Sequence, residues 1–296
     1  MPPLAERETM RDFVILTDSG SDLDAAKASE LGVRVLDLTV IKEGEEPIAD
    51  SKMDIKEFYS FLREKKTATT SAVNVEAFEE AMEEFIADDK DILYIGFSSG
   101  LSSTYNAGRL AAEEMAEKYP DRKIFACDTL CASLGQGLMV HLAVQKKNAG
   151  ATIDEVRAWV EENKLNLCHW FTVDDLMFLK RGGRVSATTA VVGSMLSIKP
   201  VMHVDNEGHL VKVTTARGRR AAIDAMFAKM KDTAIDPASQ VVYICHGDCI
   251  DDANYLAQKI KNELGVKEVY IGYTGAVIGS HSGPGTLALF YLGTER

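Results

Sequence analysis

Strand-like and helix-like patterns alternate through the first half of the 296-residue chain, and this alternation constrains its fold more than any other feature. Short apolar runs at 13–17 (FVILT) and 92–97 (ILYIGF) are separated by stretches with helical spacing, and a further helical stretch covers 134–148. Strands separated by helices are typical of βαβ units, whose strands run parallel. The pattern therefore predicts an α/β fold with a parallel sheet in the first half.

The second half has a different pattern. Apolar runs at 199–204 and 209–214 flank the turn Asn206-Glu207-Gly208, which predicts an antiparallel hairpin. Further strands are expected at 166–173, 241–246 and 267–273. A hairpin among strands that are otherwise separated by helices predicts a mixed sheet.

The chain is long enough for two domains, at roughly 100–200 residues each. The best boundary lies where a charged helix ends, near Lys164. We therefore predict two α/β domains: a parallel-sheet N-terminal domain over 1–164 and a mixed-sheet C-terminal domain over 165–296.

Three further segments complete the pattern. We expect one strand over 33–41, a hydroxyl-rich loop over 67–71 and, near the C-terminus, a polar GSHSGPGT loop followed by a short helix. The stretch 269–294 is uncharged apart from a possible charge on His281 and is long enough to cross a bilayer. Glycine and proline at its centre argue against a lipid-facing helix, so no membrane span is predicted, although a transient membrane contact stays open.

The formal net charge of −12 argues against the commonest anionic partners. An acidic chain repels phosphate backbones, so we expect no nucleic-acid partner. The first thirteen residues contain no apolar stretch typical of a secretory leader, and five cysteines are an odd number for a disulfide framework. These features predict a cytoplasmic protein with reduced thiols.

Metal and nucleotide motifs are weak. Cys127-x3-Cys131 and Cys245-His246-x2-Cys249 lack the two-residue spacing typical of structural zinc, so we expect buried thiols and no metal. The phosphate-binding pattern GxxxxGK[ST] does not occur in the sequence. Neither a resident cofactor nor ATP hydrolysis by this chain is expected.

Three polar segments are the strongest signal of a ligand site: Thr69-Thr70-Ser71, Ser98-Ser99 and the segment around His281. Loops at the carboxyl ends of parallel strands line the ligand crevice of an open α/β sheet. Hydroxyl groups and helix-start amides can hold an anion there without a fixed cation. Serine and threonine are also common helix caps, which is the structural alternative.

A basic turn, Arg181-Gly182-Gly183-Arg184, follows the apolar residues 176–179. Two arginines next to Lys180 are conspicuous in an acidic chain. Such a turn is either a solvated surface feature or a patch that docks an acidic partner or a phosphate.

From about Val14 to the C-terminus the sequence resembles the DegV family of bacterial fatty-acid-binding proteins. The resemblance rests on separated motifs in the same order: Thr17-Asp18-Ser19, Thr70-Ser71, Ser98 to Tyr105 (SSGLSSTY), Leu176 to Val185 (LMFLKRGGRV), Lys199-Pro200 and Gly279-x-His281-x-Gly283-Pro284-Gly285. Some positions depart from the family pattern: Ala72-Val73 replaces Gln-Pro, Ser103 replaces a glycine, and Arg181 replaces a lysine.

The resemblance implies two α/β domains with a fatty acid between them and no catalytic residue on the carrier itself. It implies that the carboxylate is held by Thr70, next to Ser71, by Ser98 or Ser99, and by His281. It also implies that Lys180, Arg181 and Arg184 dock a separate fatty acid kinase subunit. That kinase phosphorylates the bound carboxylate with ATP.

Two other functions stay open. One is a serine acyl hydrolase that uses Ser98 or Ser282 with His281, because triads are not fixed by chain order. The other is a binding subunit for a small carbonyl compound such as dihydroxyacetone, held through a histidine. The charge state of His281 is also open, although a neighbouring carboxylate would favour the cation.

Overall fold

The N-terminal sheet is fully parallel, as the sequence predicts. The structure, a computed structural model, describes residues 11–186 and 198–296; the first ten residues, part of the segment tested for a leader, lie outside it. Four strands form this sheet in the order β2 (Arg34–Leu36), β1 (Phe13–Asp18), β6 (Asp91–Gly96) and β7 (Ile124–Asp128). Every residue of β6 is buried, as expected for a strand covered on both faces.

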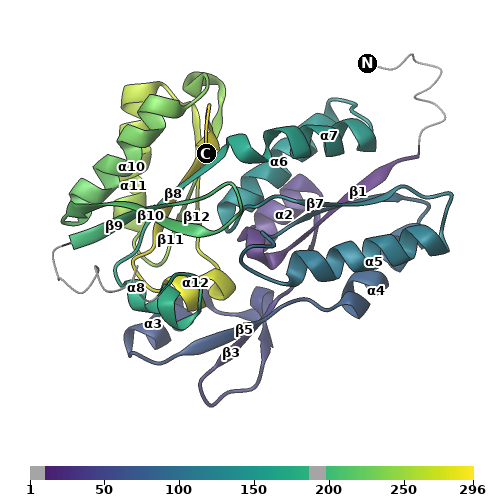
Figure 1. Cartoon of the computed structure of the whole chain (residues 1–296), viewed down its shortest axis with the longest axis horizontal. Helices are drawn as coiled ribbons and strands as arrows, with labels where there is room; N and C mark the ends of the chain where they lie inside the picture. The colour runs from purple at the N-terminus through teal and green to yellow at the C-terminus, as the bar shows by residue number, and fades with distance from the viewer. Residues whose placement is uncertain (1–10, 187–197) are drawn as a thin grey trace.

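Helices cover both faces of this parallel sheet (Figure 1). Alternate residues of β6 belong to different cores. Ile92 and Tyr94 pack with helices α4 (Val75–Ala87) and α5 (Thr104–Lys118), whereas Leu93 and Ile95 face α6 (Leu134–Asn148). This is the two-residue period of a strand. Helix α6 has its predicted bounds.

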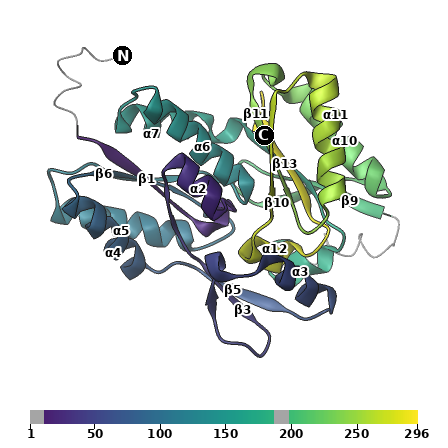
Figure 2. The same ribbon diagram turned by 180° about the vertical axis from the view of Figure 1, so that it is seen from behind.

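The C-terminal sheet is mixed, which confirms the predicted architecture. Its order is β10 (Leu210–Arg217), β9 (Ile198–Val204), β8 (Leu167–Thr172), β13 (Leu287–Leu292), β11 (Val241–His246) and β12 (Glu268–Tyr273). Only the β11–β12 pair is parallel among these described strands. Helices α10 (Arg219–Thr233) and α11 (Ile250–Leu264) cover its outer face (Figure 2).

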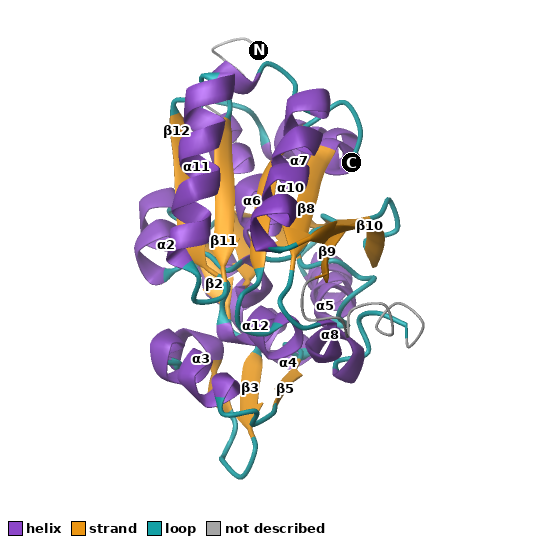
Figure 3. Ribbon diagram, turned by 90° about the vertical axis from the view of Figure 1, so that its left-hand side faces the viewer, coloured by secondary structure: helices purple, strands orange, loops and turns teal. Residues whose placement is uncertain are grey.

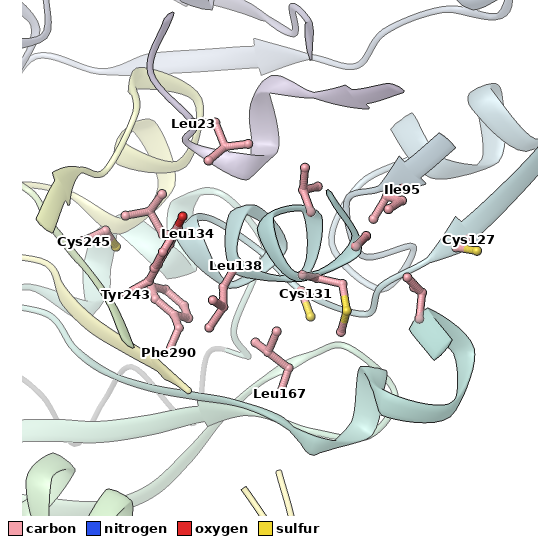
Figure 4. Close-up of a cluster of buried hydrophobic side chains, with 14 of the residues drawn as sticks. Leu23, Ile95, Cys127, Cys131, Leu134, Leu138, Leu167, Tyr243, Cys245 and Phe290 are labelled. Atoms are coloured by element: carbon pink, nitrogen blue, oxygen red, sulfur yellow. The ribbon is translucent and has the colours of Figure 1, made fainter. Parts of the chain in front are cut away.

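Helix α6 joins the two sheets into one core. It contacts β1 and β6 on one side and β8, β11 and β13 on the other. Figure 4 shows Leu134 and Leu138 of this helix between Ile95 of the parallel sheet and Phe290 of the mixed sheet. The boundary predicted at residue 164 lies between α7 (Ile153–Asn163) and β8, and it stays a prediction.

A third sheet corrects two local predictions. The segment expected as one strand over 33–41 is divided between β2 and β3 (Thr39–Lys42), which belong to different sheets. The segment expected as a loop at 67–71 is strand β5 (Ala68–Ser71), which pairs antiparallel with β3. Strand β4 (Ile48–Ala49) completes this small sheet. Threonine is β-branched and suits a strand that has one polar face. Strand β5 (ATTS) consists mainly of hydroxyl residues, so it lacks the apolar residues by which a strand is usually recognised in a sequence.

The small sheet lies beside two short helices, α3 (Ile55–Arg63) and α12 (Ala276–Ser282) (Figure 3). The chain therefore ends differently from the prediction: α12 carries the histidine, and strand β13 follows it. Strand β13 lies between β8 and β11 and is almost fully buried. Its short apolar sequence does not alternate, and such a run fits a helix and a buried strand equally well. In the described part of the chain, no helix is long and apolar enough to span a membrane.

Candidate functional site

Thr70 and His281 form the centre of the candidate site. The hydroxyl oxygen of Thr70 lies 2.8 Å from Nε2 of His281. Strand β5 fixes Thr70, because this residue pairs with Val40 in the antiparallel register of β3 and β5. His281 lies in the last turn of α12, and α12 packs against β5 and α3. The structure thus brings together two predicted carboxylate ligands that lie 211 positions apart in the sequence.

The other side of His281 faces the basic glycine turn. Nδ1 of His281 has no hydrogen-bond partner among the described residues. A Cβ atom placed on Gly182 would lie only 2.2 Å from this nitrogen. Gly182 has φ −71°, which any residue can adopt, so the requirement for glycine comes from the space that the imidazole occupies. Because helix α8 (Leu176–Arg181) ends at this turn, it forms one wall of the site.

Burial keeps His281 neutral. Loss of water around the ring lowers the pKa of His281 to about 4, and the positive charge of Arg184 acts in the same direction. Both effects favour the neutral imidazole near neutral pH.

Arg184 faces the site. Its guanidinium donates hydrogen bonds to the carbonyl of Gly182 and, at 3.1 Å, to that of Leu101. Burial lowers the pKa of Arg184, but an arginine retains its charge near neutral pH. The structure thus places a half-buried cation beside His281, at a position where the sequence predicts a docking residue.

A cavity of about 370 Å³ opens next to these residues. Thr70, His281 and Arg184 line it together with many apolar side chains: Leu38, Phe97, Phe171, Leu179, Val204, Leu210, Val277, Ile278 and Phe290. These apolar residues come from the mixed sheet, from helices α8 and α12, and from the segments that follow strands β2 and β6 of the parallel sheet. The cavity therefore lies between the mixed sheet and the carboxyl end of the parallel sheet. Cavities of this size with a few convergent polar groups are typical small-molecule sites.

Four serines line the cavity: Ser102, Ser103, Ser133 and Ser282. None of them was predicted as a carboxylate ligand, and only Ser282 was named from the sequence, for the hydrolase alternative. Ser102 shares a hydrogen bond of 2.9 Å with Thr104, and the buried hydroxyl of Ser282 has no hydrogen-bond partner among the described residues. The sequence did contain a signal for two of them. In the SSGLSST segment, the pair Ser102-Ser103 follows the pair Ser98-Ser99, and only the first pair was predicted to bind the carboxylate.

The predicted serines lie elsewhere. Ser98 is buried, and its hydroxyl donates to the carbonyl of Gly208 at 2.9 Å, which ties the loop to the β9–β10 hairpin. Ser99 and Ser71 are exposed. None of the three contributes to the cavity wall, so the structure brings only Thr70 and His281 of the five predicted carboxylate ligands together at the cavity.

The three predicted docking residues also lie in different places: two are near the surface, and one lines the cavity. Arg181 is exposed and stacks on Phe178 with its guanidinium 4.5 Å from the ring centre, and Lys180 is half-buried. These two side chains stay accessible next to the site, whereas Arg184 belongs to the cavity wall. Their docking role stays a prediction.

Among the described residues, His281 pairs with neither serine of the hydrolase alternative. Nε2 of His281 is paired with Thr70, whereas Ser98 is bonded to Gly208 and Ser282 is unpaired among the described residues. No group of three or more His, Cys, Asp or Glu residues in 11–186 and 198–296 could hold a metal ion. Nε2 of His281 thus faces the hydroxyl of a threonine rather than either serine named for the hydrolase alternative.

Comparison with known proteins decides the family. A sequence profile described as "Uncharacterised protein, DegV family" matches residues 12–294. The chain belongs to the DegV family. A DegV domain-containing protein of Clostridium perfringens (strain 13 / Type A) is 46% identical over 289 residues, which are 97% of this chain and 99% of that protein. Another, from Streptococcus pyogenes serotype M3, is 34% identical over 283 residues, 95% and 98% of the two chains.

Solved structures of DegV proteins share the whole fold. A DegV lipid-binding protein from Thermotoga maritima superposes with a TM-score of 0.85 at 28% identity and covers 96% of this chain and 99% of its own. A DegV family protein from Thermus thermophilus, described by its fatty-acid binding, has a TM-score of 0.84 at 32% identity and covers 96% and 100%. The sequence resemblance to the DegV family is thereby confirmed.

Proposed function

We propose that this DegV protein binds one long-chain fatty acid, with the carboxylate at Thr70 and His281 and the alkyl chain in the cavity, and presents the carboxylate to a separate ATP-dependent kinase. The observation that carries the proposal is the Thr70–His281 pair at the edge of a mainly apolar cavity. The fatty-acid binding described for the Thermus thermophilus relative supports it.

The polar groups suit a carboxylate. The hydroxyl of Thr70 can donate to one carboxylate oxygen while Nε2 of His281 holds the hydroxyl in place. Arg184 supplies a positive charge beside the pair, and hydrogen bonds that involve a charged group are stronger than neutral ones. This cluster fixes the orientation of the ligand.

The apolar wall suits an alkyl chain. Each buried methylene contributes roughly 0.8 kcal/mol of gross transfer free energy, so a dozen would contribute on the order of 10 kcal/mol. Losses of translational and conformational freedom offset much of that gain. Affinity therefore comes mainly from the chain, and the polar cluster selects the acid.

Exposure supports the orientation of the ligand. Thr70 and His281 are only partly buried, whereas Ser133, Cys245 and Thr274 of the same cavity are at most 5% exposed. A carboxylate at Thr70 would lie near the surface, where a second protein can reach it. The chain would extend into the buried part.

The proposed partner is a kinase because the sequence lacks the phosphate-binding motif that ATP chemistry commonly uses. Lys180 and Arg181 lie at the end of helix α8, next to the proposed carboxylate position, and give an acidic surface of the kinase a place to dock. The carrier contributes positioning, and the kinase contributes the chemistry. We place this exchange in the cytoplasm, where ATP is available.

Native mass spectrometry tests the proposal. The purified protein should carry one acyl chain per polypeptide, and delipidated protein should bind oleate or stearate again in a titration. A ligand-free mass together with no rebinding would refute fatty-acid binding. For the kinase, Arg181→Glu should slow carboxylate phosphorylation without loss of bound lipid, and equal turnover of the variant would refute the docking role.

A further inference from the structure

A second polar cluster lines the cavity apart from the carboxylate position. It consists of Ser133, Cys245 and Thr274, each at most 5% exposed. The hydroxyl of Ser133 lies 3.2 Å from Sγ of Cys245, and the hydroxyl of Thr274 donates to the same sulfur at 3.1 Å. A cavity for an unsubstituted alkyl chain has no need of these groups, so they require an explanation.

The cluster lies about one helix length from the carboxylate position. Thr274 precedes α12, and His281 lies in the last turn of that helix. Thr274 and His281 are seven positions apart, and at about 1.5 Å per residue this separation corresponds to roughly 10 Å along the helix. A fatty acid held at His281 would therefore bring the middle of its chain, rather than its first carbons, to the cluster.

The backbone of Ser133 is held in an unusual conformation. Its φ of 56° and ψ of −149° form a combination that glycine adopts far more readily than other residues. Its N–H donates to the carbonyl of Gly20 at 2.7 Å, and its hydroxyl donates to the buried carboxylate of Asp22. These contacts fix the side chain at the cavity wall, and backbone strain of this kind is concentrated at ligand sites.

The cluster offers both a donor and an acceptor. Because the hydroxyl proton of Ser133 is directed to Asp22, its oxygen lone pairs can accept a proton from another group. Burial raises the pKa of Cys245 to about 12, so the residue is a neutral thiol with an S–H to donate. A hydroxyl group both donates and accepts, so it would satisfy this cluster, whereas a methylene would satisfy neither part.

We propose that Ser133, Cys245 and Thr274 form a subsite for a hydroxyl group near the middle of the acyl chain, so that the ligands of this protein include hydroxy fatty acids. The inference rests on the proposed binding of a fatty acid in this cavity. It adds the chemical class of the ligand, because an alkyl hydroxyl buried against apolar side chains alone would lose its hydrogen bonds to water without replacement.

Competition binding with two ligands tests the subsite. Stearate is compared with stearate that carries one hydroxyl group near the middle of its chain, and the readout is the ratio of the two Kd values. The wild-type protein should bind the hydroxylated acid at least as tightly as stearate. Thr274→Val keeps the side-chain shape and removes the hydroxyl, and it should shift the ratio about tenfold against the hydroxylated acid. Cys245→Ala should shift it in the same direction.

Thr172→Val is the matched control. Thr172 is fully buried, its hydroxyl has no hydrogen-bond partner in the described chain, and it lies outside the cavity wall. This substitution should leave the ratio unchanged. The subsite is refuted if the wild-type protein disfavours the hydroxylated acid tenfold, or if Thr274→Val and Cys245→Ala leave the ratio at the wild-type value while stearate still binds. If stearate itself does not bind, the proposed function fails instead.

Discussion

Nε2 of His281 lies 2.8 Å from the hydroxyl of Thr70, across 211 positions of sequence. The contact joins the small antiparallel sheet of the first half to the short helix α12 of the second half. Both residues line a cavity that is mainly apolar. The pair is therefore the structural basis for the proposed carboxylate site.

Thr70→Val should weaken fatty-acid binding more than tenfold. The substitution keeps the branched side chain that suits strand β5 and removes the hydroxyl that we expect to bind the carboxylate. A hydrogen bond to a charged group contributes about 1.5–3 kcal/mol. Isothermal titration of delipidated protein measures the change. Thr69→Val is the control, because Thr69 is exposed on the neighbouring position of the same strand, and equal losses in both variants would contradict the assignment.

Fatty-acid binding should become tighter as the pH falls from 7 to 5. The pKa of His281 is about 4 without ligand because of burial and the charge of Arg184, and a bound carboxylate should raise it. The complex then holds more protons than the free protein below the new pKa, so acid favours binding. NMR of the His281 imidazole with and without ligand measures both pKa values. His281→Gln should remove this component of the pH dependence, and an unchanged imidazole pKa on binding would argue against contact.

Gly182→Ala should displace His281 and weaken lipid retention. A Cβ atom at this position would lie 2.2 Å from Nδ1, although φ of −71° allows alanine. Gly183→Ala provides the contrast: no atom lies within 4 Å of the added carbon, but φ of +72° is unfavourable. We expect Gly183→Ala to lower the thermal midpoint while it preserves affinity. The same loss of affinity in both variants would show that the turn as a whole, rather than the imidazole contact, matters.

Ser98→Ala and Ser102→Ala should have different effects. Ser98 holds the carbonyl of Gly208 and should contribute about 1–3 kcal/mol to the free energy of unfolding, since its loss leaves a buried carbonyl unpaired. Ser102 lines the cavity, so its substitution should weaken lipid binding with a smaller change in stability. Denaturant unfolding and lipid titration on the two variants separate the roles. A loss of affinity confined to Ser98→Ala would restore the assignment made from the sequence.

The sequence was most informative where a local pattern determines the structure. Helix α6 and strand β11 have their predicted bounds because long helical spacing and a compact apolar run are read within one window. Strand β5 was missed because its stability comes from pairing with β3, which no local pattern reports. Strand β13 was missed because it lies inside the mixed sheet and is almost fully buried. Its residues are therefore nearly all apolar and do not show the alternation of apolar and polar residues that is typical of a half-exposed strand.

The candidate site shows the same limit of prediction from local sequence patterns. Thr70 and His281 could be chosen by residue type and by resemblance, but the choice between Ser98 and Ser102 depends on the path of one loop. Arg184 was expected at the surface because it is a charged residue in a glycine turn. Its guanidinium instead satisfies the carbonyls of Gly182 and Leu101, which are contacts that only the folded chain provides.

The most direct test is a crystal structure of the protein with bound stearate. The account predicts elongated electron density that starts at Thr70 and His281, with the carboxylate within hydrogen-bond distance of the threonine hydroxyl, and continues through the cavity toward Thr274. An empty cavity in crystals of lipid-loaded protein, or a fatty acid bound elsewhere with Thr70 and His281 untouched, would contradict it.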